Sequence, residues 1–318
     1  MHAIAQHRKA FMRVGIATSF AATGMLLVSS CGDPGEPDPS GSSHQAAAEA
    51  PLHHLLPPEI AEQGFITVGS DIAFPPVEFE DGSGNIVGVD PDIAQEMGRK
   101  LGVQFKFENA PFDTLVTDLN SGRFDIAMSA MTDTKERRDG IDPETGQKVG
   151  EGVDFVDYFT AGISLYTLTS SNADLKDWKD LCGMSVAVQA GTVAHDIAQS
   201  QEERCAEGPA GQLKIEQFDS DEQAQARVFA GGADVGASDY PVAAYAVKQA
   251  EGDSLRIVGR QLGAAPYGIA TRKSEGQLRE ALRAALNAII QDGSYGKVLA
   301  KWGLAEGAVD KARTNTGR

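Results

Sequence analysis

The chain of 318 residues is poor in cysteine and in basic side chains. Its three cysteines are too few for a disulfide scaffold and lack the paired spacing of a zinc site. The 28 Lys and Arg against 45 Asp and Glu give a formal net charge of -17, which disfavours binding to nucleic-acid phosphates. Only one long uncharged apolar run is present, so a protein with several membrane spans is excluded.

Motifs of catalysis are also missing. The sequence contains no G-x-x-x-x-G-K-[ST], no H-E-x-x-H and no G-x-S-x-G. Gly82, Gly84 and Gly88 suggest a hairpin rather than a dinucleotide loop, because the turn-rich segment 81–85 lies between two short β-rich runs. We therefore expect no metal, no cofactor and no enzymatic activity. The many carboxylates leave a general acid–base pair open as an alternative.

The apolar run lies near the N-terminus and is typical of an export signal. Arg8, Lys9 and Arg13 precede the uncharged segment 14–28, which is too short to span a bilayer. Small residues then lead to Cys31, the pattern of a bacterial lipobox, in which the cysteine becomes the lipidated first residue. We expect residues 1–30 to be a signal peptide and Cys31 to anchor the protein to the cell membrane. An ordinary secretory signal with an incidental cysteine is the alternative.

The segment 31–57 is rich in Gly, Pro, Ser and Ala and is typical of a flexible tether. From Pro58 onward, short β-rich runs alternate with amphipathic helical patterns, as in 93–101, where apolar residues recur every four positions. Such alternation predicts parallel βαβ units in doubly wound sheets. A second strand–helix cycle begins near Ser185, so we expect two lobes.

Four segments together resemble a known family. In chain order they are 64–76, 88–94, 124–137, and the pair formed by 188–192 and 234–239. Segment 88–94 has a glycine–hydrophobic–acid–x–acid signature, in which Pro91 replaces the usual aliphatic residue but suits the first turn of a helix. In this combination and order, the chain is similar to the extracytoplasmic solute-binding proteins that deliver polar amino acids to ABC importers.

The resemblance implies an α/β fold of the periplasmic-binding-protein type, a two-lobed clamp in which each lobe has a doubly wound, mostly parallel sheet. The chain would cross between the lobes near 164–167 and near 261–266. The expected division is 58–164 with 264–306 for a discontinuous lobe 1, 165–263 for lobe 2, and 307–318 for a C-terminal tail. We expect a monomer that works with a membrane permease.

The resemblance also implies a cleft that holds a free amino acid, whose two charged groups need partners when they are buried. Arg137 would bind the carboxylate and Asp239 the ammonium. Thr192 and Val193 begin a helix, which favours an anion. The other candidates would enclose or hydrogen-bond the ligand: Asp71, Phe74, Phe112, Ser129, Ala130, Thr132 and Gln189.

Each of these residues alone has a simpler explanation. Arg137 belongs to a run of charged residues typical of a solvated surface, and Asp239 precedes a Tyr–Pro pair typical of a turn. Aromatic residues are usually core residues, and hydroxyl side chains usually bond nearby backbone. Only their joint order along the chain favours the site.

A stretch between Arg137 and Phe155 departs from the family pattern. It has roughly a dozen more residues than relatives usually carry, which is within the range of a tolerated or functional loop. The sequence Asp-Pro-Glu-Thr-Gly within it indicates a turn. We expect an exposed hairpin over about 138–152, close to the cleft mouth.

Two cysteines remain once Cys31 is assigned to lipid. Export places them in an oxidising compartment. Cys182 precedes the strand expected from Ser185, and Cys205 follows a helix that would pack on the same sheet. We predict a disulfide between them, with two separate buried thiols as the alternative.

We therefore predict an extracytoplasmic lipoprotein that captures a polar amino acid for an ABC importer. Glutamine-like and basic amino acids are expected to bind before aliphatic ones, because Asp71 and Gln189 would face the ligand's side chain. An enzyme on the same fold, such as a small-acid dehydratase (a lyase), is one alternative. A lipoprotein that senses its ligand and signals to a membrane receptor is another. The presence of both Arg137 and Asp239 argues against the enzyme.

Overall fold

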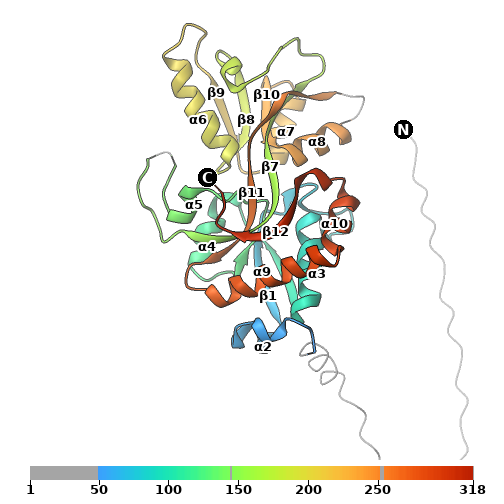
Figure 1. Cartoon of the computed structure of the whole chain (residues 1–318). Coiled ribbons are helices and arrows are strands. Elements are labelled where there is room, and N and C mark those ends of the chain that lie inside the picture. Colours follow the sequence, from blue (N-terminus) through green and yellow to red (C-terminus); the bar gives the residue numbers. More distant parts are fainter. Residues whose placement is uncertain (1–48, 144, 251–253, 318) are drawn as a thin grey trace, which may run out of the picture. The chain divides into compact units, whose positions relative to one another are not determined.

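The computed structural model describes residues 49–143, 145–250 and 254–317 (Figure 1). The predicted signal peptide, Cys31 and most of the predicted tether lie outside the described residues. Among the residues described, no helix has the length and apolar character needed to cross a membrane.

Two groups of parallel strands share one nine-stranded sheet, in the order β5-β1-β6-β11-β7-β10-β8-β9, with β12 paired to β7. The strands are β1 (Phe65–Ser70), β5 (Gln104–Asn109), β6 (Ile126–Ala127), β7 (Val153–Leu168), β8 (Ser185–Gln189), β9 (Lys214–Phe218), β10 (Val235–Asp239), β11 (Leu255–Arg272) and β12 (Ala308–Thr314). Strand β1 is parallel to β5 and β6, and β8 is parallel to β9 and β10. A separate antiparallel sheet contains β2 (Ala73–Phe74), β3 (Glu78–Glu80) and β4 (Ile86–Val87).

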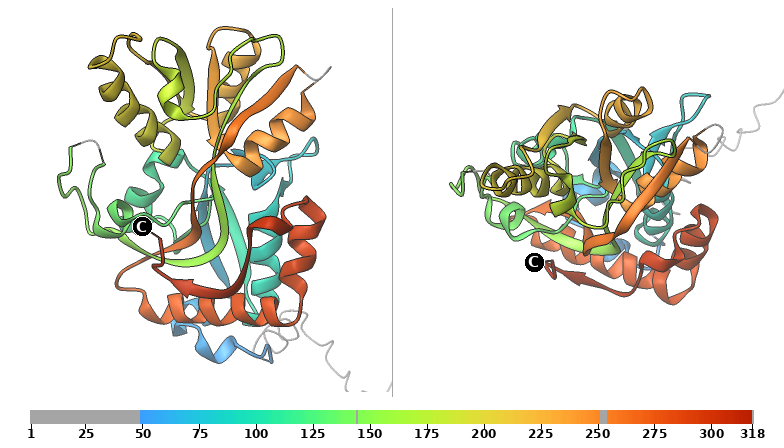
Figure 2. Two further views of the ribbon diagram at one scale, coloured as in Figure 1. Left: turned by 45° about the horizontal axis from the view of Figure 1, so that its top comes forward. Right: turned by 90° about the horizontal axis from the view of Figure 1, so that it is seen from above.

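Helices cover the two groups of strands and define the two lobes (Figure 2). Lobe 1, around β1, β5 and β6, carries α2 (Pro58–Gln63), α3 (Val89–Leu101), α4 (Leu115–Asn120), α5 (Lys135–Asp139), α9 (Gly276–Gln291) and α10 (Ser294–Trp302). Lobe 2, around β8, β9 and β10, carries α6 (Val193–Ala206), α7 (Asp221–Phe229) and α8 (Tyr240–Gln249). Short 3-10 turns lie at His53–Leu55, Phe112–Thr114, Trp178–Leu181 and Ala305–Gly307.

The long strands β7 and β11 run antiparallel through both lobes. The predicted crossings at 164–167 and 261–266 fall within these two strands. Their register shifts between Val258 and Leu262 and again before Ala265, so the ladder is irregular where the chain passes between lobes. The buried cores divide in the same region, because Ala161 belongs to a lobe 1 cluster and Ile163 to a lobe 2 cluster.

Helix α3 shows how the sequence pattern produces this packing. Its stripe of Ile93, Met97 and Leu101 is fully buried in the lobe 1 core. Gly102 ends the helix in the left-handed conformation, with φ 71°. At the other end, Gly88 has φ 140°, and a Cβ there would come within 2.1 Å of the Val77 carbonyl oxygen. Only glycine therefore allows the chain to enter α3 so close to β3.

The packed region begins earlier than predicted. Leu56 is buried, and the Leu52 N–H donates to the Lys100 carbonyl at 3.0 Å. The His53 ring nitrogen Nδ1 lies 2.8 Å from the Leu101 carbonyl oxygen. Residues 52–57 therefore pack on the end of α3, and assigning them to a tether was wrong. The leucines among them supply the apolar surface that this packing needs.

The assignment of residues 307–318 to a C-terminal tail was also wrong, because residues 308–314 form strand β12, which pairs with β7. Ala312 is 1% exposed. Beyond the strand, the Thr316 N–H donates to Asp157 and the Gly317 N–H donates to Asp133. The sequence gives little sign of this strand, since most of its side chains are polar or charged and its edge position leaves them in water.

The insertion after Arg137 folds back on itself as expected. Helix α5 ends at Gly140, and Ile141 then pairs with Lys148 in an antiparallel bridge. Val149 is 72% exposed, so the outer part of this hairpin packs little of its apolar surface.

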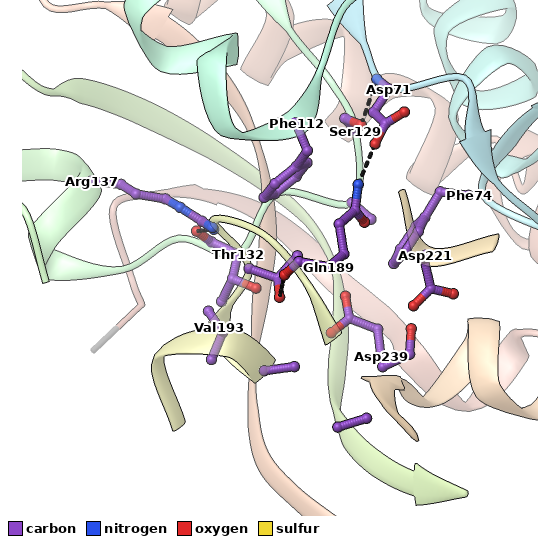
Figure 3. A pocket seen from close by; sticks show the side chains of 15 residues that line it. Asp71, Phe74, Phe112, Ser129, Thr132, Arg137, Gln189, Val193, Asp221 and Asp239 are labelled. Carbon is purple, nitrogen blue, oxygen red and sulfur yellow. Dashed lines mark hydrogen bonds between the residues drawn. The ribbon is translucent and has the colours of Figure 1, made fainter. Parts of the chain in front are cut away.

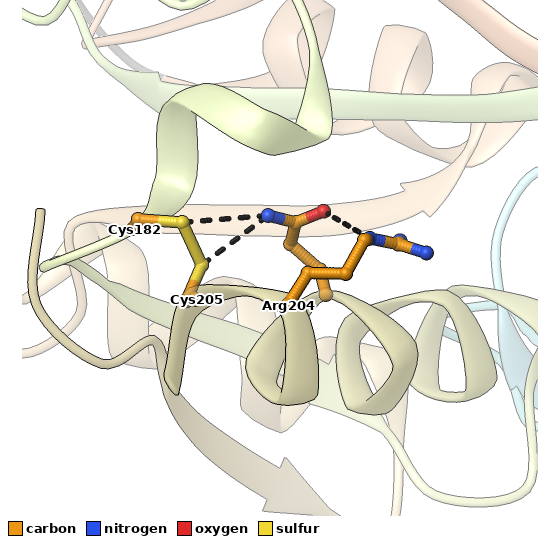
Figure 4. The surroundings of a disulfide bond; sticks show 4 residues. Cys182, Arg204 and Cys205 are labelled. Atoms are coloured by element: carbon orange, nitrogen blue, oxygen red, sulfur yellow. Dashed lines mark hydrogen bonds between the residues drawn. A yellow bond between two sulfur atoms is a disulfide. The ribbon is translucent and has the colours of Figure 1, made fainter. Parts of the chain in front are cut away.

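A disulfide joins Cys182 to Cys205, whose Cα atoms are 5.3 Å apart (Figure 4). Cys205 lies near the end of α6, and Cys182 follows the 3-10 turn that ends at Leu181. The Gln201 side-chain amide lies 3.4 Å from the Cys182 sulfur and 3.2 Å from the Cys205 sulfur. The bond ties helix α6 to the entrance of β8 in lobe 2.

Removal of this bond should destabilise lobe 2. The bond closes a loop with a sequence separation of 23 residues. In the chain-entropy model such a loop stabilises the folded state by about 3 kcal/mol. We expect the double substitution Cys182→Ser/Cys205→Ser to lower the free energy of unfolding by that amount in a urea titration. Labelling of both cysteines in the unfolded, unreduced wild-type protein would contradict the bond.

Candidate functional site

A pocket between the two lobes collects every ligand residue predicted from the sequence (Figure 3). Its lining contains Asp71, Phe74, Phe112, Ser129, Ala130, Thr132, Arg137, Gln189, Thr192, Val193 and Asp239, together with Ala194, Asp221, Ala237 and Ser238. The last four were missed by the sequence analysis. Residues far apart in the chain meet here, as Asp71 and Gln189 do, which are 118 positions apart.

The fold delivers these side chains from the carboxyl ends of parallel strands. Asp71 follows β1, Ser129 follows β6, Gln189 ends β8 and Asp239 ends β10. In open α/β sheets the carboxyl ends of the strands are where ligands bind. The pocket therefore lies where two such edges, one from each lobe, face each other.

Arg137 is held in place at one end of the pocket. It comes from α5, and its guanidinium donates to the Thr132 carbonyl and to the Gly191 carbonyl, both at 2.9 Å. The guanidinium also lies 5.2 Å from the centre of the Phe112 ring, a cation–π contact. Burial lowers the pKa of Arg137 from its ordinary value, but the neighbouring carboxylates of Asp196 and Asp239 oppose that shift. Arginine stays charged under such shifts, so the group can still bind an anion.

Asp239 is the acid on the lobe 2 side. The Tyr267 hydroxyl, from lobe 1, donates to Asp239 Oδ2 at 2.6 Å. Burial raises the pKa of Asp239 to about 6, and the hydrogen bond from Tyr267 and the charge of Arg137 limit the rise. The carboxylate is therefore ionised at neutral pH and can accept from an ammonium group.

Two further carboxyls stand apart from the guanidinium. Asp71 is buried and accepts a 2.5 Å hydrogen bond from the Gln189 amide, and burial raises its pKa to about 6. Asp221, the first residue of α7, is 1% exposed and accepts from the Gln225 amide. Burial raises the pKa of Asp221 to about 7, and the nearby charges of Asp239 and Asp71 add to that effect. The pocket thus has three carboxyls for one guanidinium and favours a cation.

Asp221 carries no distinctive signal in the sequence. Ser220 precedes it and caps α7, its hydroxyl accepting from the Gln223 N–H. An acid in the first turn of a helix is ordinary, because it interacts favourably with the helix dipole. Only the packing of α7 against the end of β10 turns Asp221 into a pocket residue.

Two of the predicted hydroxyls are already used within the protein. Thr192 Oγ1 donates to the Gln189 carbonyl and accepts from the His195 N–H as the cap of α6. Ser129 Oγ donates to Glu78 and accepts from the Asp71 N–H. Their role is to hold the pocket walls in position. Among the described residues no group of three His, Cys, Asp or Glu side chains could hold a metal ion.

Three hydrogen bonds cross from one lobe to the other at the pocket. Asp71 of lobe 1 accepts from Gln189 of lobe 2, and Tyr267 of lobe 1 donates to Asp239 of lobe 2. Arg137 of lobe 1 donates to the carbonyl of Gly191 in lobe 2. The structure therefore has the lobes in contact, with Phe74 and Phe112 on different sides of the space between them (Figure 3).

Comparison with known proteins places the chain among binding proteins. Residues 66–305 match the family model of bacterial extracellular solute-binding proteins, family 3. The arginine-binding protein ArgT of Corynebacterium glutamicum is 30% identical over 304 residues, which cover 95% of each chain.

Two solved structures are similar over most of the chain. An ancestral arginine-binding protein bound to arginine is 32% identical, with a TM-score of 0.67 and coverage of 75% of this chain and 98% of that one. An ancestral amino acid-binding protein described as a precursor of cyclohexadienyl dehydratase is 32% identical, with a TM-score of 0.66 and coverage of 77% and 97%. The predicted two-lobed α/β fold with mostly parallel sheets is confirmed.

Replacement of Asp221 by asparagine should stabilise the ligand-free protein in a pH-dependent way. The folded state holds a proton on Asp221 up to about pH 7, whereas the unfolded chain loses it near its ordinary pKa of 3.8. The folded state therefore loses stability as the pH rises between these values, and the loss is constant above them. The amide cannot ionise, so it avoids this loss.

We expect the melting temperature of Asp221→Asn to exceed that of the wild type by several degrees at pH 8 and by much less at pH 4.5. The neighbouring substitution Glu222→Gln, on the exposed side of α7, serves as the control and should show no such trend. A difference that is equal at the two pH values would show that the pKa of Asp221 is not raised.

Proposed function

The chain belongs to family 3 of the bacterial extracellular solute-binding proteins, and on this basis we propose that it captures an amino acid with a cationic side chain, arginine before others. The family prediction made from the four segments is confirmed. The predicted general function is also confirmed: the chain is an extracytoplasmic amino acid-binding protein of the kind that serves ABC importers.

The observation that carries the choice of ligand is the excess of carboxyls in the pocket. Arg137 binds the carboxylate of the amino acid, and Asp239 binds its ammonium group. Asp71 and Asp221 are then left without a positively charged partner. A guanidinium or ammonium at the end of the ligand's side chain supplies that partner. A neutral amide supplies only hydrogen bonds, and an aliphatic side chain supplies none. The arginine-binding relatives support the same order.

The two aromatic rings and the pocket loops complete the proposed site. Phe74 and Phe112 enclose the ligand's methylene groups, and the Phe112 ring also orients Arg137. The backbone at Ala130 and Thr132 offers hydrogen bonds to the ammonium. The N–H groups at the start of α6, at Thr192 and Val193, add to the attraction for the carboxylate.

We further propose that the protein works outside the cytoplasm, at the surface of the cell membrane. Lipidation at Cys31 would hold it at the membrane surface, where a monomer passes its ligand to a permease. The pocket acts by binding alone, because Arg137 and Asp239 are engaged by the two ends of a zwitterion. A sensing role would use the same site, and uptake assays with and without the permease distinguish the two.

Loss of the guanidinium tests the clamp. Truncation of one partner of a buried charge pair typically costs about 2–5 kcal/mol, so Arg137→Ala should weaken arginine binding by at least about thirtyfold in calorimetry. Asp239→Ala should have a comparable effect. Lys135→Ala, an exposed cation on the same helix, should bind arginine as the wild type does. Native affinity in both pocket variants would contradict the clamp, and tighter binding of leucine than of arginine would contradict the ligand.

A further inference from the structure

Two carboxyl groups lie behind the pocket and do not line it. Glu78, in β3, and Asp90, in the first turn of α3, are both 0% exposed. The titratable groups that face them are Asp71, Tyr158 and Tyr267, and none of these carries a positive charge. A pair of buried acids without a cation cannot hold two negative charges at moderate cost.

Both acids hold the loop that follows β6. Ser129 Oγ donates to Glu78 Oε1 at 2.8 Å, and the Ala130 N–H donates to Asp90 Oδ2 at 3.2 Å. The same Ser129 hydroxyl accepts from the Asp71 N–H at 3.0 Å. Ala130 has φ 46°, which is a left-handed backbone conformation. This conformation is unfavourable for any residue other than glycine, so the surrounding contacts must stabilise it. The acids therefore fix a strained part of the pocket wall.

The remaining oxygen of each of these two carboxyl groups lacks a hydrogen-bond donor. Glu78 Oε2 and Asp90 Oδ1 are fully buried and receive no hydrogen bond from any N–H or O–H of the described residues. The two residues are neighbours in the fold, because the Asp90 N–H donates to the carbonyl of Val77, the residue before Glu78, at 3.0 Å. Each carboxyl group also influences the pKa of the other. Two carboxyl groups can form a hydrogen bond only when one of them carries a proton. Burial raises the pKa of both groups, which agrees with a proton kept at neutral pH.

We propose that Glu78 and Asp90 share a single proton and thereby act as positioning residues, which hold Ser129 and Ala130 in the geometry that binds the ligand. The inference rests on the proposed function in that the loop is taken to contact an amino acid. Asp90 accepts two hydrogen bonds, from the Tyr158 hydroxyl at 2.8 Å and from the Ala130 N–H, which favour its ionised form. Among the described residues, Glu78 accepts one hydrogen bond, from Ser129, so the proton resides on Glu78.

This arrangement sets an alkaline limit on ligand affinity. When the shared proton leaves, two negative charges face each other, and none of the described groups that act on them is a cation. Their repulsion displaces the loop after β6, which contains Ser129 and Ala130. The backbone of Asp71 moves with this loop, because its N–H donates to Ser129. Ligand affinity should then fall, although no residue that contacts the ligand has changed.

The substitution Glu78→Gln tests the shared proton. Its amide can donate permanently to Asp90 and accept from Ser129, so it imitates protonated Glu78 and cannot ionise. We expect its dissociation constant for arginine to be within about threefold of the wild-type value at pH 7. Between pH 7 and pH 10 the wild type should weaken at least tenfold relative to Glu78→Gln. The ratio of the two constants cancels the titration of arginine itself.

Glu80→Gln, two residues further along β3 and exposed, is the matched control and should follow the wild-type pH profile. A ratio between wild type and Glu78→Gln that stays constant from pH 7 to pH 10 would overturn the proposal. So would a Glu78→Gln protein that fails to bind arginine at pH 7 while the wild type binds it.

The double substitution Glu78→Gln/Asp90→Asn gives a second test. In the double variant, the amide at position 90 turns its NH2 group either toward the Ala130 N–H or toward the amide at position 78. In either orientation two N–H donors face each other, so a hydrogen bond is lost. Each single amide should retain binding at pH 7, whereas the double variant should lose at least tenfold. Additive effects of the two substitutions would contradict a shared proton.

Melting of the ligand-free protein separates this inference from the proposed function. The folded state keeps the proton of Glu78, whose pKa is raised, while the unfolded chain loses it above its ordinary pKa of 4.5. The wild type therefore loses stability relative to Glu78→Gln as the pH rises from 5 to 9. A melting-temperature difference that does not change with pH would reject the shared proton, even if arginine proved not to be the ligand.

Discussion

Three carboxyls face one guanidinium in the pocket between the lobes, and the rest of the site depends on this unequal charge. Charges removed from water need partners, and the donors to these acids that the structure describes, such as Gln189, Gln225 and Tyr267, carry no positive charge. Each of the three carboxyls therefore has a raised pKa when no ligand is present. A ligand with two cationic groups and one carboxylate adds one net positive charge and therefore halves this imbalance.

The frame of the molecule makes this arrangement possible. Strands β7 and β11 run through both lobes, so the carboxyl ends of β1 and β6 face those of β8 and β10 across a short gap. Behind the lobe 1 wall, Glu78 and Asp90 form a second layer that fixes the loop after β6. Tyr267, on β11, links the layers, because its ring packs near Tyr158 while its hydroxyl reaches Asp239. The pocket acids and the buried pair behind them are therefore connected through Tyr267 and the loop after β6.

The sequence predicted those parts of the structure that depend on local patterns in a fixed order. Asp71, Gln189 and Asp239 were found through the resemblance to a known family, because they lie in three of the four segments that carry it. Asp221 was not found, since an acid after a capping serine has an ordinary explanation at the start of a helix. Strand β12 and the packing of residues 52–57 were missed because these segments have few apolar side chains. Those side chains become buried only through contacts with β7 and α3, which lie far away in the sequence. The buried pair of Glu78 and Asp90 depends on contacts between distant segments that no local pattern reveals.

The excess of carboxyls leads us to expect that the pocket recognises positive charge at the end of an amino acid's side chain. Calorimetric titration with arginine and with citrulline examines this charge alone, because citrulline has nearly the same shape but a neutral urea group in place of the guanidinium. Hydrogen bonds to charged groups contribute about 1.5–3 kcal/mol each, so arginine should bind at least about thirtyfold more tightly at pH 7. In Asp71→Asn/Asp221→Asn the difference should largely disappear. Equal affinity of the wild type for arginine and citrulline would show that the pocket does not recognise positive charge on the ligand's side chain.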